Sequence, residues 1–159
     1  MRDNLRHYID TSMNAEEAKY RLLGDGVESL TEEMNPEEET KHYIHMSKSS
    51  NKVKSYQRSF EVDKEDCVED EVQTMIDKLV DDLPVGASAE TSYVRFRMKD
   101  AVPEKPGVYT AIKVPCTVSV SSSGGDGGDY VHNVFSVNQT GEDIKAIFNV
   151  TTEAFTPEE

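Results

Sequence analysis

The second half of the chain alternates apolar and polar residues with a period of two, which is the pattern of half-buried β-strands. The longest alternating segment covers residues 108–120, and shorter ones cover 91–99, 130–137 and 144–150. The turn-forming sequence SSSGGDGGD follows the longest segment, and NQTGED precedes the last one. We therefore predict an antiparallel meander of four strands, in which Pro115 marks a sheet edge or a bulge.

One segment has the period of a helix instead. Between residues 63 and 83, apolar residues recur at intervals of three or four and form a single stripe, made of Val68, Val72, Met75, Ile76, Leu79, Val80 and Leu83. Asp63 is the candidate N-cap, and Pro84 and Gly86 follow the last apolar residue. The pattern predicts one amphipathic α-helix over about 63–83.

The first half of the chain has a weaker pattern. Residues 20–23 and 27–34 are strand candidates that can pair as a hairpin. Two further strand candidates, 40–46 and 52–60, lie on either side of the polar sequence SKSSN. These two candidates predict a long protruding loop or hairpin over 35–62.

The ends of the chain have no clean period, so we expect an N-terminal arm over 1–18 and a C-terminal tail over 151–159. Val is the commonest apolar residue, with 17 copies against 6 of Leu, and this balance favours strands. The predicted fold is a single domain over 1–159 that is mainly β (α+β). It is an antiparallel β-sandwich or small barrel with one flanking helix.

The composition allows only a thin hydrophobic core. Leu, Ile, Val and Phe make up about 21% of the 159 residues, just above the roughly 20% below which a highly charged chain is expected to be disordered. Association with further copies can supply the burial that a small monomer lacks. The sequence therefore favours an oligomeric protein.

The net charge of −14 argues against binding to nucleic acid or to an anionic membrane, because both need clustered Lys and Arg. The distribution of charge is uneven. Residues 41–60 contain no acidic side chain, whereas the segments on both sides are strongly acidic. This basic island (Lys41, Lys48, Lys52, Lys54 and Arg58) suits head-to-tail self-association, in which two different patches of one surface meet.

No motif for catalysis or for a cofactor is found. His42 and His45 are three residues apart, so on a strand they face opposite sides and do not form a metal site. The GGDGG sequence lacks the Lys and the helix of a phosphate-binding loop. Cys67 and Cys116 are expected to be buried, reduced thiols. With no signal sequence and no apolar run long enough to span a bilayer, synthesis in the cytosol is expected.

Taken in order, the short sequence elements resemble the major tail tube proteins of long-tailed, non-contractile (siphovirus-type) bacteriophages. The resemblance rests on the order and spacing of fragments over nearly the whole chain. They are HYIDT at 7–11, LLGDGVE at 22–28, Met34–Pro36, Glu39–Thr40, Tyr43–Ile44, Ser55–Tyr56, GGDGG at 124–128, the turn through Gly141 and the final Phe155–Pro157.

This resemblance implies a non-enzymatic structural subunit of the virion tail. Such subunits form hexameric rings that stack into a hollow tube, through which the genome passes into the host without specific DNA binding. It implies no cofactor and no membrane contact. It also implies synthesis in the bacterial cytoplasm and contacts with the tape measure protein and with the tail terminator and distal tail proteins. The loop at 35–62 would reach an adjacent ring, and both chain ends would bridge neighbours.

Two hypotheses about particular residues follow. Acidic side chains would line the tube and repel DNA phosphates, with Asp25, Glu28, Glu32 and Glu33 as the candidates. The basic island, Lys41, Lys48, Lys52, Lys54 and Arg58, would contact an adjacent subunit or ring; the alternative is a solvated loop that keeps the monomer soluble. The competing function classes are a soluble acidic binding protein such as a DNA mimic, and a carbohydrate-binding β-sandwich of the same virion, which the absence of Trp weakens.

Overall fold

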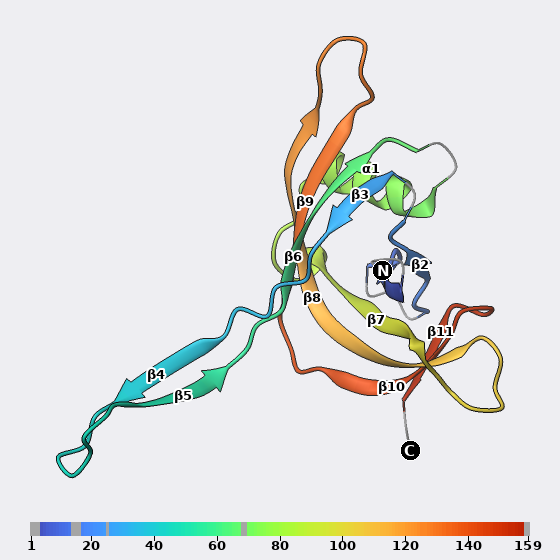
Figure 1. Cartoon of the computed structure of the whole chain (residues 1–159). Coiled ribbons are helices and arrows are strands. Elements are labelled where there is room, and N and C mark those ends of the chain that lie inside the picture. Colours follow the sequence, from blue (N-terminus) through green and yellow to red (C-terminus); the bar gives the residue numbers. More distant parts are fainter. Residues whose placement is uncertain (1–3, 14–16, 25, 68–69, 158–159) are drawn as a thin grey trace.

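The computed structural model describes residues 4–13, 17–24, 26–67 and 70–157. In this part of the chain, nine strands form one twisted antiparallel sheet and two more form a separate hairpin (Figure 1). The strands are β1 Leu5–Asp10, β2 Tyr20–Leu22, β3 Val27–Leu30, β4 Glu37–Lys41, β5 Ser50–Ser55, β6 Ser59–Glu65, β7 Glu90–Ala101, β8 Val108–Gly124, β9 His132–Gln139, β10 Ile144–Asn149 and β11 Ala154–Pro157. The helices are α1 Glu71–Asp82 and the short 3-10 helix η2 Gly86–Ala89. The mainly β class with one α-helix is confirmed, and the sheet does not close into a barrel.

The long strand β8 organises the sheet. On one side it pairs with β7 from Ala111 to Thr117, and on the other side its first half pairs with β10 and its second half with β9. The predicted meander therefore holds for β7, β8 and β9, whereas β10 returns to β8. Pro115 lies between the two neighbours, after the last residue paired with β10 and before the first paired with β9. Its missing N–H is tolerated because this edge of β8 changes partner there.

The sheet is buried on both faces near β7. Six consecutive residues of β7, from Thr91 to Phe96, are buried. Tyr93 belongs to the larger hydrophobic cluster, which includes α1, while Val94 and Phe96 belong to a second cluster with Phe148 of β10. The alternation of apolar residues predicted strands here, but it did not predict that both faces would be covered.

The N-terminal segment differs from the predicted arm. Residues 5–10 form β1, which pairs with β2 on one side and with β7 on the other. Tyr8 contributes to one cluster and Ile9 to the other, so this strand is also covered on both faces. Its pattern was misleading because a strand that is buried on both faces does not alternate. The remainder of the predicted arm and tail includes residues 1–3, 14–16 and 158–159, which lie outside the described residues.

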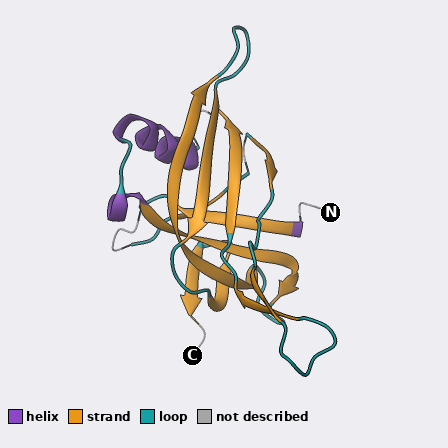
Figure 2. Ribbon diagram, turned by 90° about the vertical axis from the view of Figure 1, so that its left-hand side faces the viewer, coloured by secondary structure: helices purple, strands orange, loops and turns teal. Residues whose placement is uncertain are grey.

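The helix is shorter than predicted. It begins at Glu71, and the Asp70 side chain caps it by accepting a hydrogen bond from the Val72 backbone N–H at 3.1 Å. The predicted N-cap, Asp63, lies in β6 instead. The first residue of the predicted stripe, Val68, is outside the described residues. The buried stripe of α1 packs on one face of the sheet, and Figure 2 shows the helix at that side.

A buried polar network fixes the start of α1 to the sheet. Lys64 of β6 has no exposed surface, and its Nζ lies 3.0 Å from an Asp70 carboxylate oxygen. Lys64 also donates to the Gln73 side-chain oxygen, and Gln73 in turn donates to Asp66. The charge of the buried lysine is therefore compensated by polar side chains at the start of α1 and in the segment before it.

Two hairpins extend from the body in different directions (Figure 1). One is the tip of β8 and β9, which contains the Gly-rich turn. The other consists of β4 and β5, which pair only with each other in the described part of the chain. The connecting tip covers residues 42–49, so the predicted strands 40–46 and 52–60 were misplaced by several residues. The predicted pairing of 20–23 with 27–34 was also wrong, because β2 pairs with β1 and β3 pairs with β6.

Candidate functional surfaces

Glu32, a predicted channel-lining residue, is buried. Only 2% of its side chain is exposed. One carboxylate oxygen lies 2.8 Å from both the Arg58 and the Arg95 guanidinium groups. The other accepts a hydrogen bond from the Tyr93 hydroxyl at 2.9 Å and lies 3.5 Å from the His7 ring. We call this group of side chains, together with Asp143, the Glu32 cluster.

Arg58, a predicted contact residue of the basic island, also belongs to this cluster. Besides Glu32, its guanidinium contacts the Asp143 carboxylate at 3.0 Å. Its backbone N–H donates to the Gln139 side chain, which also donates to Asp143. Arg58 therefore joins the base of the β4–β5 hairpin to the turn between β9 and β10. The Arg58 side chain is 17% exposed, and its guanidinium group contacts carboxylates of its own chain.

The charges around Glu32 offset the cost of its burial. Burial alone would raise the pKa of the Glu32 carboxyl, but the His7 ring, the Arg95 guanidinium and the Tyr93 hydroxyl together lower this pKa to about 2. Burial raises the pKa of Tyr93, and the adjacent carboxylate raises it further. Glu32 is thus ionised and Tyr93 neutral at ordinary pH, and Tyr93 acts as a hydrogen-bond donor.

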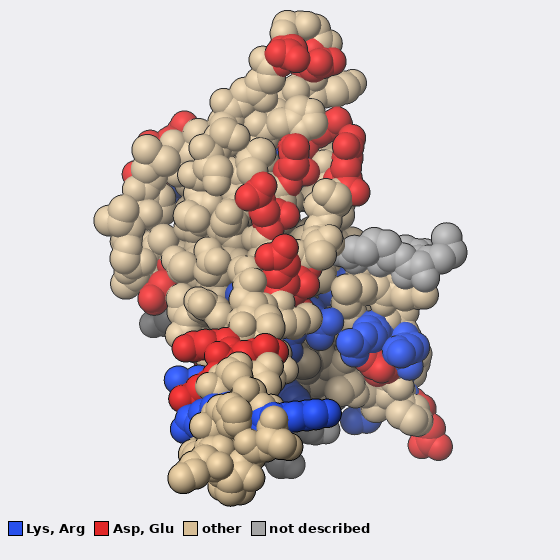
Figure 3. All heavy atoms as spheres, turned by 60° about the vertical axis from the view of Figure 1, so that its left-hand side comes forward, with Lys and Arg blue, Asp and Glu red and all other residues tan. Residues whose placement is uncertain are grey.

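The other predicted acidic candidates lie at the surface. Glu28 of β3 and Glu33 after β3 are exposed, while Asp25 lies outside the described residues. The outward positions of the neighbouring strand β6 add Glu61, Asp63 and Glu65. We call these five residues (Glu28, Glu33, Glu61, Asp63 and Glu65) the acidic face. Figure 3 shows acidic side chains following one another in a column on this side of the molecule.

Alternation along two strands explains why the acidic face is one-sided. In β6, Phe60, Val62 and Lys64 point inward, so the residues between them point outward. The adjacent strand β9 alternates in the same way, and Ser136 is paired with Glu61 while Asn138 is paired with Ser59. The outward surface of β6 and β9 is therefore polar and acidic. The sequence did not indicate these β6 positions, because Asp63 and Glu65 fell in the predicted helix and Glu61 in the predicted loop over 35–62.

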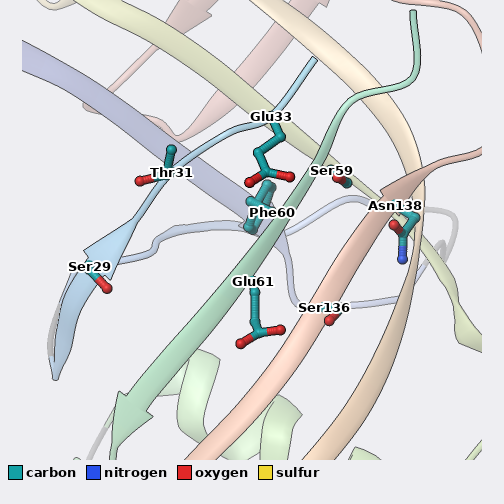
Figure 4. A pocket seen from close by; sticks show the side chains of 8 residues that line it. All are labelled: Ser29, Thr31, Glu33, Ser59, Phe60, Glu61, Ser136 and Asn138. Atoms are coloured by element: carbon teal, nitrogen blue, oxygen red, sulfur yellow. The ribbon is translucent and has the colours of Figure 1, made fainter. Parts of the chain in front are cut away.

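A shallow polar hollow of about 410 Å³ lies on the acidic face. Figure 4 shows the residues around it, with Thr31 and Glu33 from the segment after β3, Glu61 from β6, and Ser136 and Asn138 from β9. Within the described residues, no group of three or more His, Cys, Asp or Glu side chains is arranged to hold a metal ion. The hollow is thus lined by hydrogen-bonding groups and by negative charge.

The carboxylates of the acidic face raise the pKa of a histidine beside them, His132. His132 of β9 lies with its Nδ1 2.8 Å from an Asp63 oxygen and its Nε2 3.7 Å from a Glu65 oxygen. The hydrogen bond with Asp63 is the main cause that raises the pKa of this exposed imidazole. Glu28 contributes to the same rise, which agrees with its place on the face.

The four lysines of the basic island lie on the hairpin and its tip. Lys41 ends β4, Lys48 lies in the tip, and Lys52 and Lys54 are in β5, all of them exposed. Lys52 is paired across the hairpin with Glu39, and the Lys41 ammonium lies 3.6 Å from a Glu39 oxygen. The structure thus separates the predicted basic island into four hairpin lysines and Arg58 in the interior.

The two thiols differ from each other. Cys116 is buried in the larger cluster, where burial raises its pKa to about 12, whereas Cys67 is only partly buried. The expectation that both are buried was therefore wrong for Cys67. Neither forms a disulfide within the described residues. In the same part of the chain, no helix has the length and apolar character that crossing a membrane requires.

Comparison with solved structures finds this fold in a tail assembly. The tail of an empty GTA particle with C6 symmetry matches with a TM-score of 0.58 and 9% identity, over 97% of this chain and 96% of that chain. The tube-terminating cap of the anti-feeding prophage covers 91% of this chain and 89% of its own, with 8% identity and a TM-score of 0.49. No family model matches the chain, and no curated protein sequence matches it. The likeness to the GTA tail establishes the fold.

Proposed function

We propose that this chain is the structural subunit of a phage-type tail tube, of the long-tailed, non-contractile kind. Copies of the chain form hexameric rings, the rings stack, and the genome passes through the resulting channel. The observation that carries this proposal is the fold shared with a C6-symmetric tail over almost the full length of both chains. The subunit is non-enzymatic and belongs to the virion tail.

The open edges of the sheet support ring formation. The path of the main sheet ends at β2 on one side and at β3 on the other, and both are short strands. The outer edge of each strand presents N–H and C=O groups that can pair with another chain. A neighbouring copy in the ring would continue the sheet at such an edge, so that strands from all subunits join around the channel.

The acidic face is the surface that we assign to the channel wall. DNA phosphates would be repelled by Glu28, Glu33 and Glu61, so the genome would move without being held by many weak contacts. The opposite surface of these strands packs against α1, which accordingly lies on the outside of the tube. Glu32 has no part in this wall because its carboxylate is buried.

The remaining assignments concern contacts between copies and with other proteins. The β4–β5 hairpin with its four lysines reaches an adjacent subunit or ring, whereas β1 and β11 near the two chain ends pair within their own sheet. The tape measure protein and the tail terminator and distal tail proteins are the further partners that we assign to the subunit. These partners follow from the proposed place of the subunit in a tail.

Negative-stain electron microscopy of the concentrated, purified chain tests the proposal. We expect long tubes with an axial channel and sixfold symmetry in end-on views. A chain that remains monomeric at all concentrations and salt conditions contradicts it. Binding of that monomer to a basic protein would then favour the DNA-mimic alternative, for which the acidic face is the supporting observation.

A charge reversal tests the channel wall separately. Tubes of the double variant Glu33→Lys and Glu61→Lys should retain short DNA duplexes at low salt and release them at high salt. The matched control reverses two exposed acidic residues outside the acidic face, Glu104→Lys and Glu142→Lys. Equal retention by both variants would show that the acidic face does not line the channel.

A further inference from the structure

An apolar groove lies where α1 ends. It has a volume of about 340 Å³ and is lined by Leu79, Leu83, Val85, Ala89, and Thr117–Val120 of β8. Two of its apolar side chains are mostly in solvent, Leu83 with 64% exposed and Val85 with 82% exposed. Such exposure in a chain with few large apolar residues indicates a surface that another molecule covers. We call it the helix groove.

Leu83 has an unusual backbone conformation. It caps the C-terminus of α1 with φ of 46° and ψ of 58°, in the left-handed region, and its N–H donates to the Leu79 carbonyl. Gly or Asn normally occupies this position because a larger side chain is strained there. Because the Leu83 side chain is mostly exposed, it adds little to the stability of the isolated chain and does not offset this strain. Strained positions of this kind gather at functional contacts.

A second exposed apolar group lies at the tip of the β4–β5 hairpin. Ile44 is fully exposed and Tyr43 is 48% exposed. The tip is an ordered turn, because the Met46 N–H donates to the Tyr43 carbonyl at 3.0 Å and the His42 ring contacts the Met46 carbonyl at 2.7 Å. The rings of Tyr43 and His45 also stack, with centroids 6.2 Å apart. The hairpin thus presents Ile44 and Tyr43 in a pre-organised shape, which lowers the entropic cost of binding.

The two surfaces have opposite charge. Lys41 and Lys48 flank the tip, and the sequence between them contains no acidic residue. The last turn of α1, which leads directly into the groove, contains Asp81 and Asp82 and no basic residue, and the negative end of the helix dipole lies at the same end of the helix. An apolar tip flanked by lysines therefore matches an apolar groove at the acidic end of α1.

From these observations we propose that the hairpin tip of one copy, with Ile44 and Tyr43, binds in the helix groove of the next copy, against Leu83 and Val85. The inference rests on the proposed function and names which two surfaces meet. Each copy has one tip and one groove, and the hairpin projects away from its own body (Figure 1). The contact is therefore heterologous and propagates from copy to copy.

Disulfide crosslinking between two variants tests the contact. Both contain Cys67→Ser, so that the partly buried thiol is removed, while Cys116 is buried. One variant adds Ile44→Cys and the other adds Val85→Cys. Under assembly conditions and mild oxidation, we expect a disulfide-linked dimer only in the mixture. The control replaces the second variant by Tyr130→Cys, an exposed position (71%) on the β8–β9 tip, and should give no dimer.

The outcomes separate this proposal from the proposed function. Tubes that form without the Ile44–Val85 crosslink overturn the contact and leave the tube subunit standing. The absence of both tubes and crosslink overturns both. A dimer between two copies of the Ile44→Cys variant, with none in the mixture, also overturns the contact, because the tip would then meet another tip.

A second variant distinguishes the contact from a folding defect. Leu83→Asn places a residue that tolerates the left-handed conformation and removes the apolar side chain. We expect its Tm to equal or exceed that of the wild type, while the concentration needed for assembly rises at least tenfold. The variant Val131→Asn, which removes a partly exposed apolar side chain (41%) outside both the hairpin and the helix groove, should assemble like the wild type. Assembly of Leu83→Asn at the wild-type concentration would overturn the contact.

Discussion

The Glu32 cluster and the β4–β5 hairpin use the same kinds of charged side chain in opposite ways. In the cluster, carboxylate and guanidinium groups from four segments of the chain meet in the interior, and Glu32 alone contacts two arginines, a tyrosine and a histidine. In the hairpin, glutamates and lysines are exposed and contact mainly their direct neighbours. Arg58 and Lys54 are close in sequence, but Arg58 belongs to the buried cluster and Lys54 to the exposed hairpin.

Burial, and not charge type, decides what these residues do. A buried ion pair strongly destabilises the fold when one partner is removed, because the other charge stays behind without compensation. Exposed pairs contribute little to stability and remain available to other molecules. The cluster is therefore expected to determine whether the subunit folds, and the hairpin whether it associates.

The largest expected effect is that of Glu32→Ala. The substitution leaves Arg58 and Arg95 without their shared carboxylate, so we expect a loss of about 3–5 kcal/mol in the free energy of unfolding. Urea denaturation followed by circular dichroism measures it. Glu38→Ala, in the exposed hairpin, is the control and should change stability by less than about 0.5 kcal/mol. Equal effects of the two substitutions would remove the distinction between the regions.

The loss of stability in Glu32→Ala is expected to depend on pH. The pKa of Glu32 is lowered to about 2 in the folded protein, below its ordinary value of 4.5. Its contribution to stability is therefore fully present above pH 4.5 and is lost as the pH falls through about 2. The stability difference between wild type and Glu32→Ala should shrink over this interval. A difference that stays constant from pH 6 to pH 2 would contradict the ionised cluster.

A smaller effect on stability is expected in the hairpin. The double variant Lys52→Glu and Lys54→Glu should unfold within about 0.5 kcal/mol of the wild type, because both side chains are exposed. Tube formation, measured by light scattering, should nevertheless be impaired. Lys105→Glu with Lys145→Glu reverses two exposed lysines elsewhere and should leave assembly intact. Unchanged assembly of the hairpin variant would refute its contact role.

The smallest expected effect concerns His132 on the acidic face. Its pKa is raised above the ordinary 6.5, mainly by Asp63. The interaction thus favours the folded state at pH below the ordinary pKa and is lost as the pH rises through the raised value. An NMR titration should show this raised pKa, and Asp63→Asn should lower it. A pKa that is the same in both proteins would show that the pair is not formed in solution.

The sequence predicted those parts of the fold whose signal is local. The alternation from Val114 to Val118 predicted β8 because each outward residue lies between two buried ones. The stripe from Val72 to Leu79 predicted α1 for the same reason, with the period of a helix. The start of the helix was misplaced because β6 also contains acidic residues suited to an N-cap. The third inward residue of β6, after Phe60 and Val62, is Lys64, and a lysine does not mark a buried strand position in the sequence.

The Glu32 cluster could not be predicted because its members are brought together by pairing between distant strands. Nothing near Glu32 in the sequence distinguishes it from the exposed Glu33. The structure separates them because the Glu32 carboxylate turns toward Arg95 of β7, while Glu33 lies across from Ser59 at the surface. The four lysines and Arg58 lie in one segment without acidic residues, 41–60, and this suggested one basic patch. In the structure, however, the Arg58 side chain turns inward.

The pairing order of the strands has a consequence for the synthesis of the chain. The early strand β1 needs β7, and β6 has no neighbour except β3 until β9 has been made. During translation, the sheet can therefore be completed only when most of the polypeptide has left the ribosome, and such distant pairings are slow to form. The early strands β1 and β6 would thus reach their final pairing only after β7 and β9 have been made, so folding of the sheet follows the synthesis of most of its strands.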